Sequence, residues 1–173
     1  MRRLLKVIGE WIPPIAIAFV LSLSFRSFVG EAAKIPSGSM IPTLQINDRL
    51  FIEKMIDPSD LRDGDIVVFK PPFKSEYDRL IKRLIGVGGD TIEIRDGALY
   101  RNGEKIDEPY IEEPMNYDYG PITVPEGKFF FLGDNRNNSY DSHLWPTPFV
   151  DESEIIGKAV FRYYPFSEME MLQ

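Results

Sequence analysis

Apolar residues are spread unevenly along the chain, with one long run near the N-terminus and only short runs after it. The stretch "WIPPIAIAFVLSLSF", from Trp11 to Phe25, carries no charged residue. Counting outward from Val7 to Val29 gives about the 20 residues that a membrane-spanning helix needs. The pattern therefore predicts one transmembrane helix at the N-terminal end.

The residues around this run suggest how the helix would sit in a bilayer. Pro13 and Pro14 fall near its expected start, where a helix tolerates proline best. Arg2, Arg3 and Lys6 precede it, and positive charge tends to remain on the cytoplasmic side. We therefore expect a single-pass protein with a cytoplasmic N-terminus and with the chain after about residue 30 on the far side.

Two other interpretations of the N-terminal segment remain open. A cleaved signal peptide also has a basic start and an apolar core, and "GEA" at Gly30 to Ala32 could serve as its cleavage site. A helix buried in a soluble core is the second alternative. We favour a retained membrane anchor over residues 1–29, because the apolar run is long and has charges on both sides.

The rest of the chain alternates short apolar strands with turns, which is typical of a mainly β protein. Asp96-Gly97 and Asn102-Gly103 are strong hairpin turns, so residues 91–106 should form a small meander, and a small lobe or insert is expected around residues 91–118. Residues 70–78 and 112–121 are predicted as loops. The expected strands are residues 49–53, 65–69, 80–87, 91–94, 98–100, 128–133 and 157–164.

Composition removes several classes of function. The chain of 173 residues has no cysteine and one histidine, so a disulfide framework, a thiol nucleophile and a histidine-based zinc site are excluded or strongly disfavoured. The formal net charge of −7 argues against a nucleic-acid partner. No metal or cofactor is expected.

The stretch "IPSGSMIPTL", residues 35–44, holds two serines that could act as nucleophiles if a base lies nearby. A serine hydroxyl is a weak nucleophile and needs a partner that accepts its proton. His143, with Asp141 two residues away, leaves a Ser-His-Asp arrangement open. The spacings G-x-S-x-G around these serines and S-x-x-K anywhere are absent, so neither of those known nucleophile motifs applies.

A lysine is the other candidate base. In a strand over residues 80–87, Lys82 shares its face with Leu80 and Leu84, while Arg83 points to the other face. Lowering a lysine pKa from about 10.4 to about 8 by burial disfavours the charged form by roughly 3 kcal/mol, a cost acceptable for a functional group. The plainer alternative is that Lys82 extends to solvent from the end of the strand.

A third stretch, "LGDNRNNSYDSH" at residues 132–143, is rich in turn-forming residues and follows the apolar "KFFF". Loops at strand ends often carry functional residues. By itself the stretch could equally be a polar turn in which Asn and Asp side chains bond their own backbone.

Taken together, these stretches resemble the type I signal peptidases, membrane-bound serine proteases that remove signal peptides from exported proteins. The matching segments are "SGSMIPTL", "GDIVVF", "LIKRLIGVGGD" and "GDNRNNSYDSH", in that order behind an apolar anchor. The resemblance extends from Arg2 to about Pro165. Asn137 stands where many members have aspartate and His143 where many have arginine, a variant that resembles the cyanobacterial and plastid members.

The resemblance implies a Ser-Lys dyad and a mainly β fold, a signal-peptidase-like antiparallel catalytic domain over residues 30–173. Ser39 would be the nucleophile, Lys82 the general base and Ser37 an oxyanion-hole donor beside the Ser39 N–H. Gly38 would allow a tight turn between the two serines. Implied supporting roles are Ser139 bonding and aiming the Lys82 amine, Asp134 pairing with Arg83 on the outer face of the strand, and Asp141 and His143 bracing their loop. The implied lining of small apolar substrate pockets is Ile35, Pro36, Met40, Leu44, Leu80 and Ile81.

The implied partners are the signal peptides of secretory preproteins and the lipid bilayer, and we expect the chain to act as a monomer. The implied cut follows small, alanine-like residues. Two rivals remain at this point. A repressor-type Ser-Lys autoprotease would need a DNA-binding module, and a membrane-tethered β domain could bind a partner without catalysis. We expect the Ser39 hydroxyl to lie about 3 Å from the Lys82 amine.

Overall fold

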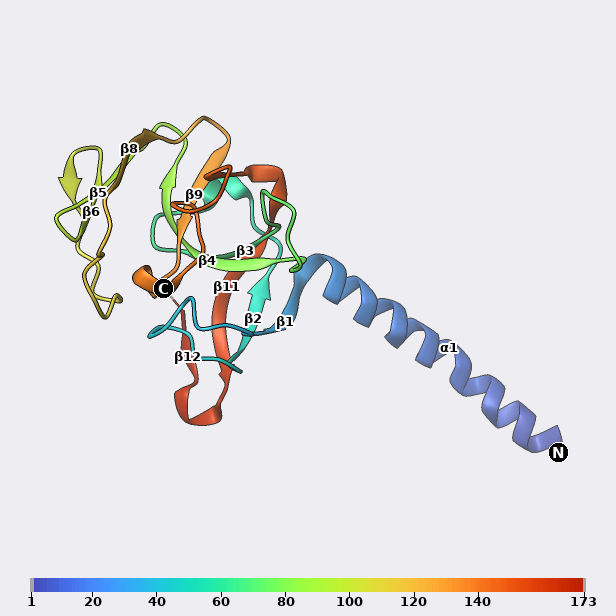
Figure 1. The fold of residues 1–173 in the computed structure, drawn as a ribbon. Helices are drawn as coiled ribbons and strands as arrows, with labels where there is room; N and C mark the ends of the chain where they lie inside the picture. Colours follow the sequence, from blue (N-terminus) through green and yellow to red (C-terminus); the bar gives the residue numbers. More distant parts are fainter. Residues whose placement is uncertain (1, 173) are drawn as a thin grey trace.

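The computed structural model describes residues 2–172, and it begins with a long helix that stands away from the rest of the molecule (Figure 1). Helix α1 (Arg2–Ser24) continues through a π-helical turn (Phe25–Val29) directly into strand β1 (Gly30–Lys34). The segment Trp11–Val29 has a mean hydropathy of 1.7, and none of it is buried. Burial in a soluble core is therefore wrong for this helix, which fits a single-pass membrane anchor.

The two prolines occupy a different place in the helix from the one expected. Helix α1 begins at Arg2, so Pro13 and Pro14 lie in its interior and not near its start. Each proline lacks the N–H that would donate to the preceding turn. The basic N-terminal residues extend the helix by more than two turns ahead of the apolar run, which the hydropathy pattern alone did not indicate.

The β domain is built on one large antiparallel sheet, which confirms the expected fold class. The strands follow the order β1-β2-β11-β3-β4-β9-β10, and β12 pairs with β11. Their bounds are β2 (Arg49–Glu53), β3 (Ile66–Phe69), β4 (Leu80–Val87), β9 (Lys128–Leu132), β10 (Phe149–Asp151), β11 (Ile155–Tyr164) and β12 (Glu170–Met171). Strands β2 and β4 have the bounds predicted from the sequence, whereas β1 and β10 lack a clear apolar pattern and were not predicted.

Strand β3 lies at the middle of this sheet, and all four of its residues are buried. Because neighbouring side chains on a strand point to opposite faces, its residues contribute to two different apolar clusters. Ile66 and Val68 join the cluster that contains Leu50 and Ile52, whereas Val67 and Phe69 join the aromatic cluster. The sheet is therefore covered on both faces, and β4, its neighbour, has little access to water.

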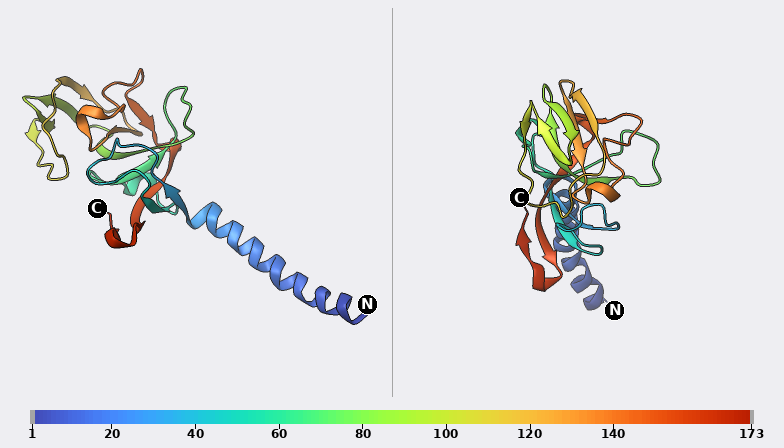
Figure 2. Two further views of the ribbon diagram at one scale, coloured as in Figure 1. Left: turned by 60° about the horizontal axis from the view of Figure 1, so that its bottom comes forward. Right: turned by 60° about the vertical axis from the view of Figure 1, so that its left-hand side comes forward.

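A second, smaller sheet is inserted between β4 and β9 and has the order β7-β6-β5-β8. Its strands are β5 (Thr91–Arg95), β6 (Ala98–Arg101), β7 (Glu104–Lys105) and β8 (Tyr119–Thr123). Asp96-Gly97 and Asn102-Gly103 adopt positive φ at both residues, as the two hairpin turns require. The small sheet lies at the end of the domain farthest from helix α1 (Figures 1 and 2).

Candidate active site

Ser39 lies in the loop between β1 and β2, held in place by backbone contacts to a distant part of the chain. The backbone N–H of Asn135 donates to the carbonyl of Ser39 at 3.1 Å, and its side-chain amide donates to the carbonyl of Gly38 at 3.0 Å. The loop itself is closed by the bond from Ile35 N–H to the Asp48 carbonyl, at 2.9 Å. Ser39 is therefore fixed between the end of β1 and the loop that follows β9.

Lys82, on β4, points at this serine. Its Nζ lies 2.6 Å from Oγ of Ser39, closer than the separation of about 3 Å expected from the sequence. Lys82 is 4% exposed, and burial lowers its pKa from the ordinary 10.5 to about 8, although Asp141 and Asp134 act in the opposite direction. A substantial fraction of this amine is therefore unprotonated at mildly alkaline pH and able to accept the proton of the serine.

The single histidine is engaged elsewhere. His143 Nδ1 lies 2.6 Å from a carboxylate oxygen of Asp141, and its ring stacks on Tyr117 with the centroids 4.0 Å apart. The other carboxylate oxygen of Asp141 accepts the N–H of Gly133 at 2.9 Å. His143 and Asp141 thus brace the loop after β9. Among the described residues the Ser39 hydroxyl is bonded by Lys82 and not by His143, so the geometry gives the Ser-His alternative no support.

Gly133 marks a tight contact between this loop and the dyad. A Cβ atom at Gly133 would collide with the Ser39 carbonyl and with Oγ of Ser139, so only glycine fits there. Ser139 is buried, yet its hydroxyl has no hydrogen-bond partner among residues 2–172. The expected bond from Ser139 to the Lys82 amine is therefore not made in this conformation, in which the amine contacts Ser39.

An apolar cavity of about 390 Å³ lies beside the dyad. Ser37, Ser39 and Lys82 form part of its wall. Of the residues predicted to line a substrate pocket, the cavity wall contains Ile35, Pro36, Leu80 and Ile81. Ser37 is exposed, so its hydroxyl is accessible to a ligand in this cavity.

Met40 and Leu44 require a correction. Both were expected to line the substrate pockets, but neither lies in the wall of this cavity and both are completely buried. They belong to the apolar cluster that also contains Ile35, and Ile81 packs against that cluster. The turn after Ser39 directs their side chains into the domain, so they support the pocket wall from behind.

A second hollow, of about 670 Å³, meets the first at Ser37, Ser39 and Lys82. Its wall is more polar and includes Asn135 and Asn138 from the loop after β9. The loop between β3 and β4 contributes Phe73 and residues 74–77. Ser39 and Lys82 therefore lie where two open hollows join, a position that a long extended chain could cross.

Arg83, the neighbour of Lys82, makes a complete set of contacts on the other face of β4. Its Nε and Nη2 donate to the two carboxylate oxygens of Asp134, at 2.8 and 2.7 Å, and its Nη1 donates to the Gly64 carbonyl at 2.6 Å. Asp134 also accepts the Thr43 hydroxyl. The expected Arg83–Asp134 pair is present, but the two side chains are at most 3% exposed, so it is buried and not on an outer surface.

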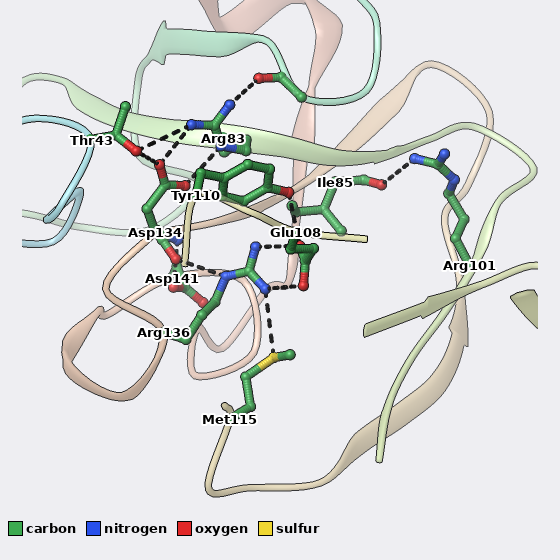
Figure 3. A network of polar contacts seen from close by, with 12 residues as sticks. Thr43, Arg83, Ile85, Arg101, Glu108, Tyr110, Met115, Asp134, Arg136 and Asp141 are labelled. Atoms are coloured by element: carbon green, nitrogen blue, oxygen red, sulfur yellow. Dashed lines mark hydrogen bonds and ion pairs between the residues drawn. The ribbon is translucent and has the colours of Figure 1, made fainter. Parts of the chain in front are cut away.

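The sequence analysis missed a second buried ion pair next to the first (Figure 3). Two guanidinium nitrogens of Arg136 donate to the Glu108 carboxylate, at 2.7 and 2.6 Å, and the Tyr110 hydroxyl donates to Glu108 at 2.8 Å. Arg136 stands within the motif "GDNRNN" and could have been suspected from its place there. Glu108 and Tyr110 lie in the loop between β7 and β8, where nothing in the local pattern distinguishes them from surface residues.

An antiparallel β domain with a serine–lysine pair beside an apolar cavity, joined to an exposed apolar helix, describes a membrane-associated serine peptidase. Comparison with known proteins specifies the class further. The chain belongs to the signal peptidase family, peptidase S26, whose model matches residues 8–164. The resemblance found in the sequence, and with it type I signal peptidase activity and the assignment as a serine endopeptidase, is confirmed.

Individual relatives support this membership over most of the chain. The sequence is 48% identical to the probable signal peptidase I-2 of Synechocystis sp., over 90% of this chain and 72% of that protein. It is 41% identical to the thylakoidal processing peptidase 1 of Arabidopsis thaliana, over 98% of this chain and 52% of that longer protein. A crystal structure of a signal peptidase I from Enterococcus faecalis aligns with a TM-score of 0.50 and 34% identity, covering 57% of this chain and 96% of the other.

Proposed function

We propose that the protein removes signal peptides from exported preproteins with Ser39 as the nucleophile and Lys82 as the general base. The observation that carries this proposal is the 2.6 Å separation of the two reactive atoms, at a lysine whose pKa burial lowers to about 8. A base works best when its pKa lies near the working pH, and desolvation brings an amine into that range.

The geometry supports a two-step acyl transfer. The unprotonated Lys82 amine accepts the hydroxyl proton as Ser39 Oγ attacks the carbonyl carbon of the scissile peptide. The resulting oxyanion accepts hydrogen bonds from the Ser39 N–H and the Ser37 hydroxyl. Lys82 then donates its proton to the departing amine, which leaves an ester between Ser39 and the signal peptide. In the second step Lys82 deprotonates a water molecule, which hydrolyses this ester and restores the free serine.

Ser37→Ala tests the oxyanion part of this mechanism. Loss of one such donor typically lowers the turnover rate by about 10²- to 10³-fold, because the bond strengthens as charge develops on the oxygen. We expect kcat to fall more than KM rises, measured on a preprotein substrate. An increase in KM with kcat unchanged would contradict the role of Ser37.

The two hollows suggest how a peptide substrate lies across the dyad. Strand β1 is an edge of the large sheet and pairs only with β2 within the described chain, so its other edge is available to an extended peptide. The apolar cavity beside Ile35 and Ile81 would take the small side chains before the cut. The more polar hollow would take the first residues after it.

We further propose that residues 1–29 form the cytoplasmic tip and membrane anchor, that residues 30–173 form the catalytic domain, and that the protein is monomeric. The anchor would hold the enzyme beside the apolar segment of its substrate in the same bilayer, which raises their effective concentration. Protease added to the non-cytoplasmic side of sealed vesicles should digest the domain after Gly30 and spare the N-terminus. A mature chain that starts near Ala33 would instead identify the segment as a cleaved signal.

A cleavage assay tests the function directly. Purified full-length enzyme in detergent should release the mature part of a model preprotein, with a new N-terminus directly after a small residue. A bulky residue placed immediately before the cut should abolish release, because the resemblance to the type I signal peptidases implies a preference for small, alanine-like residues there. If the protein bound the preprotein without cleaving it, the rival interpretation of a binding domain would be correct.

A further inference from the structure

The loop between β7 and β8 reaches from the small sheet to the two buried arginines near the active site (Figure 3). Glu108 is 8% exposed although it follows a short, exposed strand of the small sheet, and Arg136, its partner, is 2% exposed. A carboxylate so far removed from water requires a cation and hydrogen bonds to compensate for lost hydration. Glu108 has both, since it accepts two bonds from Arg136 and one from Tyr110.

Tyr110 contacts both arginines through its ring. The guanidinium carbon of Arg83 lies 3.9 Å from the ring centroid, and that of Arg136 lies 5.8 Å from it. A cation over an aromatic face is attracted by the negative charge density of the ring, more strongly when both are removed from water. Burial, with the nearby Glu108 carboxylate, raises the pKa of Tyr110, so the phenol remains neutral and can donate to Glu108.

Each of the two arginines is connected to one residue of the proposed dyad, Arg83 to Lys82 and Arg136 to Ser39. Arg83 is the chain neighbour of Lys82 on β4. Arg136 donates from Nε to the carbonyl of Gly133 at 3.0 Å, and Gly133 packs against the Ser39 carbonyl. Displacement of either arginine would therefore change the position of Lys82 or of Ser39.

We propose that Tyr110 and Glu108 are positioning residues of the peptidase, which hold Arg83 and Arg136 and thereby fix Lys82 against Ser39. The small sheet then contributes to the active site through its β7–β8 loop, which carries Glu108 and Tyr110 to the two arginines. Within the described part of the chain neither Tyr110 nor Glu108 forms a hydrogen bond to Ser39 or Lys82, so both would act through the two arginines. The inference rests on the dyad proposed above.

If Lys82 is no longer held in place, the change should be detectable in its pKa, which depends on burial and on the charged groups around it. Lys82 faces the Ser39 hydroxyl. Burial lowers its pKa, and the Asp141 and Asp134 carboxylates act in the opposite direction. If β4 is held less firmly, the amine gains partial access to water and its burial becomes less complete. Its pKa should then rise, and the midpoint of the increase of activity with pH should rise with it.

The test compares full-length Tyr110→Leu with the parent enzyme and with Tyr100→Leu, a matched control. Tyr100 also lies in the small sheet and stacks under an arginine, with the Arg95 guanidinium carbon 4.0 Å from its ring centroid. Because Arg95 pairs with Glu93 and belongs to neither of the two buried ion pairs, Tyr100→Leu should keep the parent rate and midpoint. Tyr110→Leu should lower kcat about tenfold, leave KM within about twofold and raise the midpoint by about half a pH unit.

Tyr110→Phe keeps the ring and should restore most of kcat, because only the bond to Glu108 is lost. If Tyr110→Leu does not fold by near-UV circular dichroism, Glu108→Gln decides the question with the same readouts. A variant that folds and melts at a lower temperature, with unchanged kcat and midpoint, would overturn the proposal and leave a purely structural role. Ser39→Ala is run in parallel, since residual activity there would refute the dyad itself and not the positioning by Tyr110.

Discussion

Lys82 and Arg83 are neighbours on the same buried strand, but they lie on opposite faces of β4 and have different partners. Arg83 is paired with a carboxylate, whereas Lys82 faces a neutral hydroxyl. Lys82 is 4% exposed and Arg83 is 2% exposed. Arg83 donates to both oxygens of Asp134 and to a backbone carbonyl, and it stacks on Tyr110. Lys82 points at the neutral hydroxyl of Ser39, and within residues 2–172 it forms no ion pair.

This difference shows that burial alone does not make a basic residue reactive. Burial of a cation is unfavourable on both faces, but only Arg83 has a carboxylate in direct contact to compensate for it, whereas Asp141 and Asp134 act on Lys82 without contact and offset its burial only in part. On the Lys82 face the cost appears as a pKa lowered to about 8. The choice of residue fits each role, because an arginine cannot be deprotonated in a protein, whereas a lysine can.

The largest expected effect is the loss of cleavage activity when Ser39 or Lys82 is replaced. Ser39→Ala and Lys82→Met should each lower preprotein cleavage by at least about 10³-fold, because the two side chains act as a unit. The double variant should lose little more than either single one. Lys82→Arg, which keeps the charge but cannot give up the proton, should be equally inactive. Substantial cleavage by any of these variants, measured as turnover in detergent, would refute the dyad.

On the opposite face the expected effect is on stability. Arg83→Met leaves Asp134 buried without its cation and should destabilise the fold by about 3 to 5 kcal/mol. Lys128→Met is the control, because the Lys128–Asp151 pair is 38% and 49% exposed and should contribute about 1 kcal/mol or less. Thermal unfolding of the full-length variants would measure both. Equal losses in the two variants would mean that burial of the Arg83 pair has no special role.

Lys82→Met should change the free energy of unfolding in the opposite direction from Arg83→Met and stabilise the protein near neutral pH. The folded-state pKa of Lys82 is about 8 and its ordinary value is 10.5, so between these values the unfolded chain binds more protons. The cost of burying Lys82 is therefore fully present below pH 8 and disappears as the pH rises to about 10.5. Its removal should add about 3 kcal/mol at pH 6 and almost nothing at pH 10.5.

Unfolding of Lys82→Met and the parent at several pH values measures this difference directly. Comparison within the pair cancels the titration of other groups, so only the contribution of Lys82 remains. A Lys82→Met variant that is less stable than the parent at pH 6 would show that the lysine is held by favourable charge interactions, as Arg83 is.

The smallest effect on the turnover rate is expected from replacing His143. Activity should increase with pH around a midpoint near 8, because Lys82 must lose its proton to act. His143→Asn should reduce the rate modestly, since His143 braces Asp141, and should leave that midpoint in place. Turnover between about pH 5 and 10 measures both quantities. Collapse of activity, or disappearance of the alkaline increase, would make His143 the base.

Much of the fold could be predicted from local sequence patterns. Strands β2 and β4 begin and end where their apolar runs do, and the two hairpin turns of the small sheet lie at Asp96-Gly97 and Asn102-Gly103. Such features depend on neighbours in the chain, which the sequence displays. Strands β1 and β8 lack that signal, because their exposed residues are held mainly by pairing with β2 and β5.

The residue types of the candidate site were also visible in the sequence, but their surroundings were not. The motifs indicated Ser39, Lys82, Asp134 and Arg83, whereas a choice between Lys82 and His143 as the partner of Ser39 required the resemblance to a family. Met40 and Leu44 were assigned to the pocket wall, because an apolar residue near a nucleophile has the same sequence signature whether it faces a cavity or the core.

The sequence by itself thus determined the strands with clear apolar runs, such as β2 and β4, the two hairpin turns, the apolar helix and the chemical groups available for catalysis. Only the tertiary structure decided which of two adjacent cations has a carboxylate and which has a hydroxyl, and that Glu108 and Tyr110 lie against both arginines. The physical reason is that a pKa and an ion pair depend on desolvation and on contacts between distant segments. Arg83 and Asp134 are 51 residues apart in the sequence, and Lys82 and Ser39 are 43 residues apart, so neither contact can be read from a local pattern.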